Sequence, residues 1–279
     1  MTQPPALTDL LALARHRARA KALPNHDAAM FLHRLALADL QERLGEVNRR
    51  FTSPAVVTGF PEVWQELQPD AVIVGDQEHI ALDAGAHDLV VHGMSLHWAN
   101  DPVGQLVQCR RALKPDGLCL VVLPGGRSLQ ELRVSLAEAE TIVTGGLSPR
   151  VLPMGEIRDL GALMQRAGFA LPVADSIVQT VEYSSFASLM SDLRAMGETN
   201  ALAARLRGFT SRSVFREAAR IYEGHYSTPE GRIRATAELV VLTGWAPHDS
   251  QQQPLRPGSA KARLADALAV PERPLPKDG

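Results

Sequence analysis

The stretch SPAVVTGFPEVWQE, residues 53–66, decides the fold of this chain. A run of β-branched residues ends at Gly59, and a helix is predicted to begin at Pro61, because proline is favoured at the first helical position. A strand, a glycine turn and a helix in this order open the nucleotide-binding units of α/β proteins. Such a turn brings bare backbone to a ligand, whereas here Phe60 adds a large side chain and Pro61 removes one N–H group. The stretch therefore predicts a parallel sheet with an unusual first turn.

The following residues alternate between short apolar runs and helices. The predicted elements are a strand AVIVGD at 71–76, a strand HDLVVHGM at 87–94, a helix DPVGQLVQCRRAL at 101–113, a turn KPDG at 114–117 and a buried strand LCLVVLP at 118–124. Residues 60–70 connect the first two strands, close to the minimum of about ten to twelve residues for a parallel crossover. This alternation predicts an α/β fold with a mainly parallel sheet between helices, and sites beyond the carboxyl ends of the strands.

The composition excludes several classes of protein. The chain has 279 residues, of which 45% are hydrophobic and 22% charged, as in ordinary globular proteins. A formal net charge of −2 indicates no nucleic-acid partner. The two cysteines have no metal-ligand or disulfide spacing, and no apolar run approaches the roughly 18 residues of a membrane-spanning helix. We expect a cytoplasmic protein with no metal site and no transmembrane segment.

Three residues at the predicted carboxyl edge of the sheet are candidates for binding and chemistry. Asp76 follows Gly59 at nearly the spacing of about 20 residues expected for an acid that accepts ribose hydroxyls, although a turn or cap role explains it equally well. His97 is a candidate general base and Trp98 a candidate stacking residue. The alternatives are a tryptophan that fills the core and a histidine that hydrogen-bonds a nearby carbonyl.

The C-terminal stretch GWAPHDSQQQPLRPGSAKARLADAL, residues 244–268, is dense in polar residues. His248, Asp249 and Arg256 are candidates for a substrate-binding lip, and a polar loop across the domain is the alternative. His248 and Asp249 do not predict an iron site, because a facial triad needs a second histidine.

These patterns resemble class I methyltransferases. The segment HDLVVHGMSLHWANDPVGQLVQCRRALKPDGLCLVVLPGG, residues 87–126, resembles the region around the fourth and fifth strands of that superfamily. More specific resemblance comes from segments spread over most of the chain: ALARHRARA, LQERLGEVNRRF, SPRVLPMGEIRDLGALMQRAGFALPVAD, DLRAMGETNAL and the C-terminal stretch. They are similar to bacterial relatives of the methyltransferase-like arginine hydroxylase that assembles respiratory complex I, with the malonyl-carrier-protein methyltransferase as a more distant relative.

The resemblance implies a Rossmann-like fold and an S-adenosyl-L-methionine-dependent methyltransferase that acts on a protein substrate, such as a respiratory complex I subunit. In that interpretation His97 and Trp98 face the acceptor, and His248, Asp249 and Arg256 contact the substrate. The residues implied to hold the cofactor are Thr58, Gly59, Asp76, Gln77, Met94, Ser95 and Leu96.

One departure from the superfamily pattern favours an alternative function. Where the superfamily has D-x-G-x-G-x-G, this chain has VVTGFPE, so only Gly59 matches. The alternative is a degenerate methyltransferase fold that does not bind the methyl donor and serves as an assembly factor, a chaperone or a protein hydroxylase. In either case we predict an N-terminal helical cover at 1–50, a methyltransferase core at 51–174, a C-terminal cover with sheet-completing segments at 175–270 and a disordered tail at 271–279.

Overall fold

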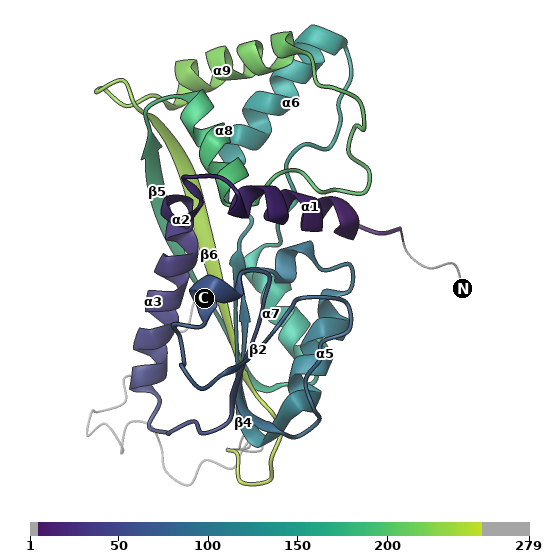
Figure 1. The fold of residues 1–279 in the computed structure, drawn as a ribbon, viewed down its shortest axis with the longest axis vertical. Helices are drawn as coiled ribbons and strands as arrows, with labels where there is room; N and C mark the ends of the chain where they lie inside the picture. The colour runs from purple at the N-terminus through teal and green to yellow at the C-terminus, as the bar shows by residue number, and fades with distance from the viewer. Residues whose placement is uncertain (1–4, 253–279) are drawn as a thin grey trace, which may run out of the picture. The chain divides into compact units, whose positions relative to one another are not determined.

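A six-stranded mixed sheet organises the protein, and the computed structural model describes residues 5–252 (Figure 1). The strand order is β2-β1-β3-β4-β6-β5. The first four strands in this order pair in parallel, and β6 pairs antiparallel with both β4 and β5. The strands are β1 (Pro54–Thr58), β2 (Val72–Val74), β3 (His87–Gly93), β4 (Leu113–Pro124), β5 (Ala170–Tyr183) and β6 (Ile233–Trp245). This arrangement confirms the predicted Rossmann-like α/β fold.

The helices form a layer on each face of the sheet and a separate cap. They are α1 (Leu10–Lys21), α2 (His26–Ala29), α3 (Phe31–Glu46), α4 (Pro61–Trp64), the 3-10 helix η1 (Leu96–Trp98), α5 (Pro102–Ala112), α6 (Gln130–Thr144), α7 (Ile157–Arg166), α8 (Phe186–Ala195) and α9 (Arg212–Tyr226). One core joins α3 and α4 to one face of the sheet, and a second core joins α5 and α7 to the other. A third core packs α6, α8 and α9 over the ends of the long strands β5 and β6 (Figure 1).

Local sequence signals explain where several of these elements begin and end. Asp101 caps α5 by accepting a hydrogen bond from Gly104 N at 2.8 Å, and Pro102 is the first helical residue, close to the predicted start at residue 101. Helix α6 ends at Gly145, whose φ of 71° is a left-handed conformation that glycine adopts without strain. The crossover from β1 to β2 contains only the four-residue helix α4, in agreement with its short predicted length.

Two predicted boundaries differ from the structure. Strand β2 ends at Val74, so Asp76 lies beyond the strand rather than at its last position. The predicted turn KPDG lies within β4, which runs from Leu113 to Pro124, and Asp116 there has a left-handed φ of 61°. A bulge in the pairing of β3 with β4, where Leu89 faces Leu118, accommodates these residues without ending the strand.

Residues Met1–Pro247 form one compact unit and His248–Gly279 a second. The helical cover, the core and most of the C-terminal cover that we predicted therefore lie in one unit, and the tail at 271–279 lies outside the described residues. Among residues 5–252, no helix has the length and apolar character needed to cross a bilayer.

Candidate functional site

Helix α1 places Arg17 against the turn that follows β1. A β-carbon on Gly59 would collide with the Arg17 guanidinium in its present position, so the guanidinium lies directly against bare backbone here. Arg17 Nη1 donates to both carboxylate oxygens of Asp76, at 2.9 and 2.8 Å, and the two side chains are only 10% and 12% exposed. The carboxylate predicted to accept ribose hydroxyls therefore binds a cation of the same chain, and the bare backbone of Gly59 faces that cation.

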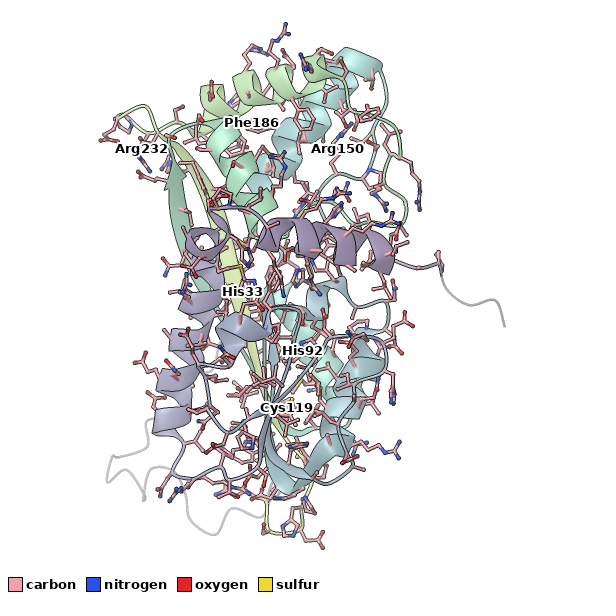
Figure 2. The ribbon with its side chains drawn as sticks, in the orientation of Figure 1. His33, His92, Cys119, Arg150, Phe186 and Arg232 are labelled. Carbon is pink, nitrogen blue, oxygen red and sulfur yellow. The ribbon has the colours of Figure 1, made fainter. Side chains whose placement is uncertain are left out.

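Trp64, from α4, covers the end of β3 in the same way. A β-carbon on Gly93 would lie 2.6 Å from the indole ring, and Trp64 is fully buried. Trp64 Nε1 donates to His33 Nδ1 at 3.1 Å, and His33 is labelled in Figure 2. Burial lowers the pKa of His33 to about 3, so the imidazole is neutral at pH 7 and its Nδ1 can accept this hydrogen bond.

Phe60 lies between His33 and Arg17. Its side chain is fully buried, its ring meets the His33 ring edge-on with 4.9 Å between centroids, and Arg17 Cζ lies 5.3 Å from its centroid. A β-carbon on Gly197 would come within 3.0 Å of Phe60 Cζ, so the segment after α8 closes over the ring. An aromatic side chain thus occupies the position beyond β1 where a cofactor turn would present bare backbone.

The remaining residues of the predicted cofactor site are also engaged within the chain. Thr58 Oγ1 donates to Gly93 O at 3.0 Å and accepts from Phe60 N at 3.2 Å. The Gln77 side chain covers Gly75. Ser95 is buried, and Leu96 packs in the core with α5. In this arrangement the residues do not fit S-adenosyl-L-methionine, because the glycine backbone and the carboxylate it would need are covered by side chains.

A cavity of about 380 Å³ lies beyond the ends of β3 and β4, between the sheet and the α6–α8–α9 cap. Met94 and Pro124 line it from the strand ends, and Met94 has a left-handed φ of 49°, a strained conformation for a non-glycine residue. Its apolar wall includes Leu132, Leu136, Leu152, Met154, Met190 and Met196. The cavity therefore has a largely apolar wall and lies next to the filled cofactor position.

Glu198 is an acidic group on the wall of this cavity. Its Oε2 accepts hydrogen bonds from Trp98 Nε1 at 2.9 Å and from His97 Nε2 at 3.3 Å. Burial raises the pKa of Glu198, but the electrostatic and hydrogen-bonding interactions with His97, the charge of Arg17 and the Trp98 bond outweigh it and lower the pKa to about 2. Among the described residues, Oε1 has no hydrogen-bond donor. An ionised carboxylate with one open oxygen thus faces the cavity.

Glu238 is a second carboxylate of the cavity wall. It lies on β6 and is 7% exposed, and its Oε2 accepts a hydrogen bond from Arg127 N at 2.9 Å. Within the described part of the chain its Oε1 has no hydrogen-bond donor. Sequence reasoning missed both acids, although a signal for Glu238 existed, since it is the single acidic residue in the apolar run ELVVLTGW. Glu198 gave no such signal, because its partners come from a distant part of the chain.

The two predicted catalytic residues lie near the cavity in different roles. Trp98 lines it and packs with α1 in a small core, and its indole N–H binds Glu198. His97 is nearly buried and binds the same carboxylate, while its Nδ1 is buried without a partner in the described residues. Both side chains therefore orient Glu198, and their direct contact with an acceptor stays a prediction.

The predicted substrate-binding lip belongs to the second compact unit. His248 and Asp249 are exposed, and His248 Nδ1 lies 2.7 Å from Ser250 Oγ. Arg256 lies outside the described residues. The role of all three in substrate binding stays a prediction. Over residues 5–252, no three His, Cys, Asp or Glu side chains gather in a way that could hold a metal ion.

Part of the chain is similar to known methyltransferase-domain proteins. Residues 31–121 match the family model described as methyltransferase domain. The arginine-hydroxylase NDUFAF5, mitochondrial, of Danio rerio is 37% identical over 202 residues, which cover 72% of this chain and 63% of that protein. The human protein of the same name is 38% identical, over 71% of this chain and 57% of its own length. Malonyl-[acyl-carrier protein] O-methyltransferase of Nitrosospira multiformis is 33% identical, over 63% and 54%.

The chain thus spans between about half and two thirds of the curated relatives it matches. Among solved structures, the YcgJ protein from Bacillus subtilis is 10% identical with a TM-score of 0.49, over 77% of this chain and 100% of that one. Phosphoethanolamine N-methyltransferase 2 of Haemonchus contortus is 11% identical with a TM-score of 0.40, over 75% and 53%.

The contact of Trp64 with Gly93 predicts that substitutions at the two positions are coupled. Gly93→Ala should lower the free energy of unfolding by about 1–3 kcal/mol, because the added methyl group overpacks the indole. In a Trp64→Ala background the same change should lower it by at least about 1 kcal/mol less, since the obstructing ring is gone. Urea denaturation of the four proteins measures this coupling. Gly45→Ala, at an exposed position with open space around it, is the control and should not destabilise the protein. Additive effects of the two substitutions would contradict the contact.

The depressed pKa of Glu198 predicts a pH-dependent contribution to stability. The carboxylate stabilises the folded protein fully above its ordinary pKa of 4.5, and this contribution is lost as the pH falls toward about 2. Glu198→Gln should therefore lower the free energy of unfolding, by at most about 3 kcal/mol at pH 7, and the difference from the wild type should shrink between pH 4.5 and 2. Denaturant titrations across this range measure it. A difference independent of pH would show that Glu198 is not ionised in the interaction described.

Proposed function

We infer that this protein binds an arginine side chain of a protein substrate and does so without a methyl donor. Residues 31–121 match the methyltransferase domain, and the chain is similar to the arginine-hydroxylase NDUFAF5. The inferred function is the degenerate-fold alternative that the sequence left open. The observation that carries it is a filled cofactor position beside a cavity to which Glu198 and Glu238 each present an open carboxylate oxygen.

The cavity has the chemistry that an arginine side chain requires. The aliphatic stem of arginine packs on apolar surface while its guanidinium seeks carboxylate oxygens. Leucine and methionine side chains supply the apolar surface, and Glu198 and Glu238 each present an oxygen with no donor in the described residues. Hydrogen bonds between a guanidinium and a carboxylate are about twice as strong as neutral ones, so these two acids would select a cationic side chain.

Methyl transfer is the second candidate, and the match to the methyltransferase domain favours it. It would require Arg17, Phe60 and Trp64 to leave their present positions before a nucleoside could approach the strand ends. Leaving would expose two aromatic side chains that are fully buried and break the ion pair of Arg17 with Asp76. We therefore rank methyl transfer below arginine binding.

The wider role that we propose follows from the relatives. Their name states arginine hydroxylation, and the resemblance of the chain to that family implies a place in the assembly of respiratory complex I. We propose that the protein meets a complex I subunit in the cytoplasm, either as an assembly factor or as an arginine hydroxylase. A mass increase of one oxygen atom on an arginine of the co-expressed subunit would distinguish the hydroxylase from the assembly factor.

Titration with S-adenosyl-L-methionine tests whether the cofactor position is closed. Isothermal titration of the wild type at millimolar ligand should give no heat of binding, and Asp76→Ala should behave in the same way. The methyltransferase of Nitrosospira multiformis serves as the control for ligand quality. Binding by the wild type that is lost in Asp76→Ala would overturn the proposal and restore the methyltransferase interpretation.

Titration with Nα-acetyl-arginine N-methylamide tests the cavity. The wild type should bind this ligand at least ten times more tightly than the norleucine analogue, which has no charge. Glu198→Gln should weaken binding by about tenfold or more, equivalent to about 1.4 kcal/mol or more. Glu182→Gln, an exposed acid that pairs with Arg232 away from the cavity, is the matched control and should bind as the wild type does. Equal binding of the two ligands would contradict the proposal.

A further inference from the structure

The mouth of the cavity, which we call the rim, exposes apolar and basic side chains. Binding of an arginine inside the cavity does not account for them. Two segments form this rim, residues 147–151 and 205–216, and side chains of both line the cavity. Arg150, labelled in Figure 2, links them, since its Nη1 donates to Thr210 Oγ1 at 2.8 Å. The Arg150 guanidinium also binds the nearly buried Glu140, so the 147–151 segment is anchored to α6. The rim is thus a defined surface of the described chain.

The rim exposes large apolar side chains. Phe209 is fully exposed, Leu147 is 71% exposed and Leu206 is 53% exposed. Phe215 is 38% exposed and also lines the cavity. Single exposed apolar residues are common on proteins, but several around one cavity are typical of an interaction site. Aromatic anchors of this kind often dominate the binding energy of protein interfaces.

The rim is also positively charged. Residues 199–216 contain four arginines and no aspartate or glutamate. Asp9 neutralises part of this charge, because it pairs with Arg205 at 2.9 Å and with Arg207 at 3.3 Å. Arg212 and Arg216 are exposed, and neither has a carboxylate within ion-pair distance in the described residues. The nearest acid in sequence, Glu217, pairs with Arg220 instead.

Two carboxylates face the interior of the cavity, and exposed arginines lie around its mouth. Glu198 and Glu238 line the interior together with Arg150, Arg194 and Arg205, of which Arg150 pairs with Glu140 and Arg205 with Asp9. A complementary ligand is therefore cationic at the centre and anionic and apolar on either side. An anionic lipid surface would complement the positive charge of the rim, but its phosphates would be repelled by the two carboxylates of the interior. A protein segment can place a cation against the carboxylates and anions against the rim at the same time.

We propose that the rim docks an acidic, leucine-rich or similarly apolar segment of the substrate protein, and that this segment flanks the arginine that enters the cavity. The inference rests on the proposed function, because it assigns the interior to an arginine. It adds the chemistry by which one arginine is chosen among many: acidic neighbours contact Arg212 and Arg216, and apolar neighbours contact Phe209 and Leu206.

Fluorescence anisotropy with three labelled dodecapeptides tests this docking. The first has one central arginine between flanks of glutamate and leucine, the second has lysine in place of glutamate, and the third has norleucine in place of the arginine. The full-length wild type should bind the first peptide at least ten times more tightly than the second. Raising the salt concentration to 0.5 M should reduce that preference, because the attraction is between exposed charges.

Variants of the rim supply the decisive comparison. Arg212→Glu combined with Arg216→Glu should weaken binding of the acidic peptide at least tenfold and improve binding of the basic one. Phe209→Ser should weaken both. Arg158→Glu combined with Arg166→Glu is the matched control, since these exposed arginines lie on or at the end of α7, which packs on the face of the sheet with α5. The control should bind as the wild type does.

Three results would overturn the proposal. They are equal affinity for the acidic and basic peptides, unchanged binding in the Arg212 and Arg216 double variant, and binding to vesicles of 30% phosphatidylglycerol without binding to any peptide. The norleucine peptide separates this proposal from the function on which it rests. If it binds as tightly as the arginine peptide and depends on Arg212 and Arg216, the rim assignment stands and the arginine assignment of the cavity fails.

Discussion

The ion pair of Arg17 with Asp76 determines how the N-terminal helix meets the sheet. Both side chains are nearly buried, so removing either one would leave an uncompensated charge, at a typical cost of about 3–5 kcal/mol. The guanidinium lies against the bare backbone of Gly59. Once α1 is held there, Phe60 is enclosed between α1, His33 and the segment after α8. The ion pair and the buried aromatic ring thus cover the same turn after β1.

Because the turn after β1 is covered, the cavity of this protein lies at a neighbouring position, beyond the ends of β3 and β4. In a parallel α/β sheet, ligands bind beyond the carboxyl ends of the strands, and here the ends of β1 and β3 are covered by Arg17 and Trp64. The cavity instead begins at Met94 and Pro124, and the cap formed by α6, α8 and α9 provides its far wall. The open space of this protein therefore lies beside the turn after β1 rather than at it.

Much of the fold could be predicted from the sequence, and much less of the site. The start of α5 at Asp101-Pro102 and the short helix at Pro61 are local signals, and the structure has both of them. The sequence predicted residues 114–117 as a turn between elements, whereas they form an irregularity inside β4, because Leu113 and Leu118 on either side of them both pair with β3. At the site, His97 and Trp98 were identified by their position after β3, but Glu198, the group that both of them bind, was not.

The amino-acid sequence alone determined the alternation of strands and helices, the parallel core and the resemblance to methyltransferases, because these depend on residue type, periodicity and caps within short windows. Only the tertiary structure decided which side chains meet at the strand ends. Arg17 and Asp76 lie 59 residues apart, and Trp98 and Glu198 lie 100 apart. Their pairing follows from how the helices pack on the sheet, and local patterns carry no information about contacts at that separation. Gly59 is the clearest case: the same glycine serves a cofactor turn or an arginine contact, and only the position of α1 distinguishes the two.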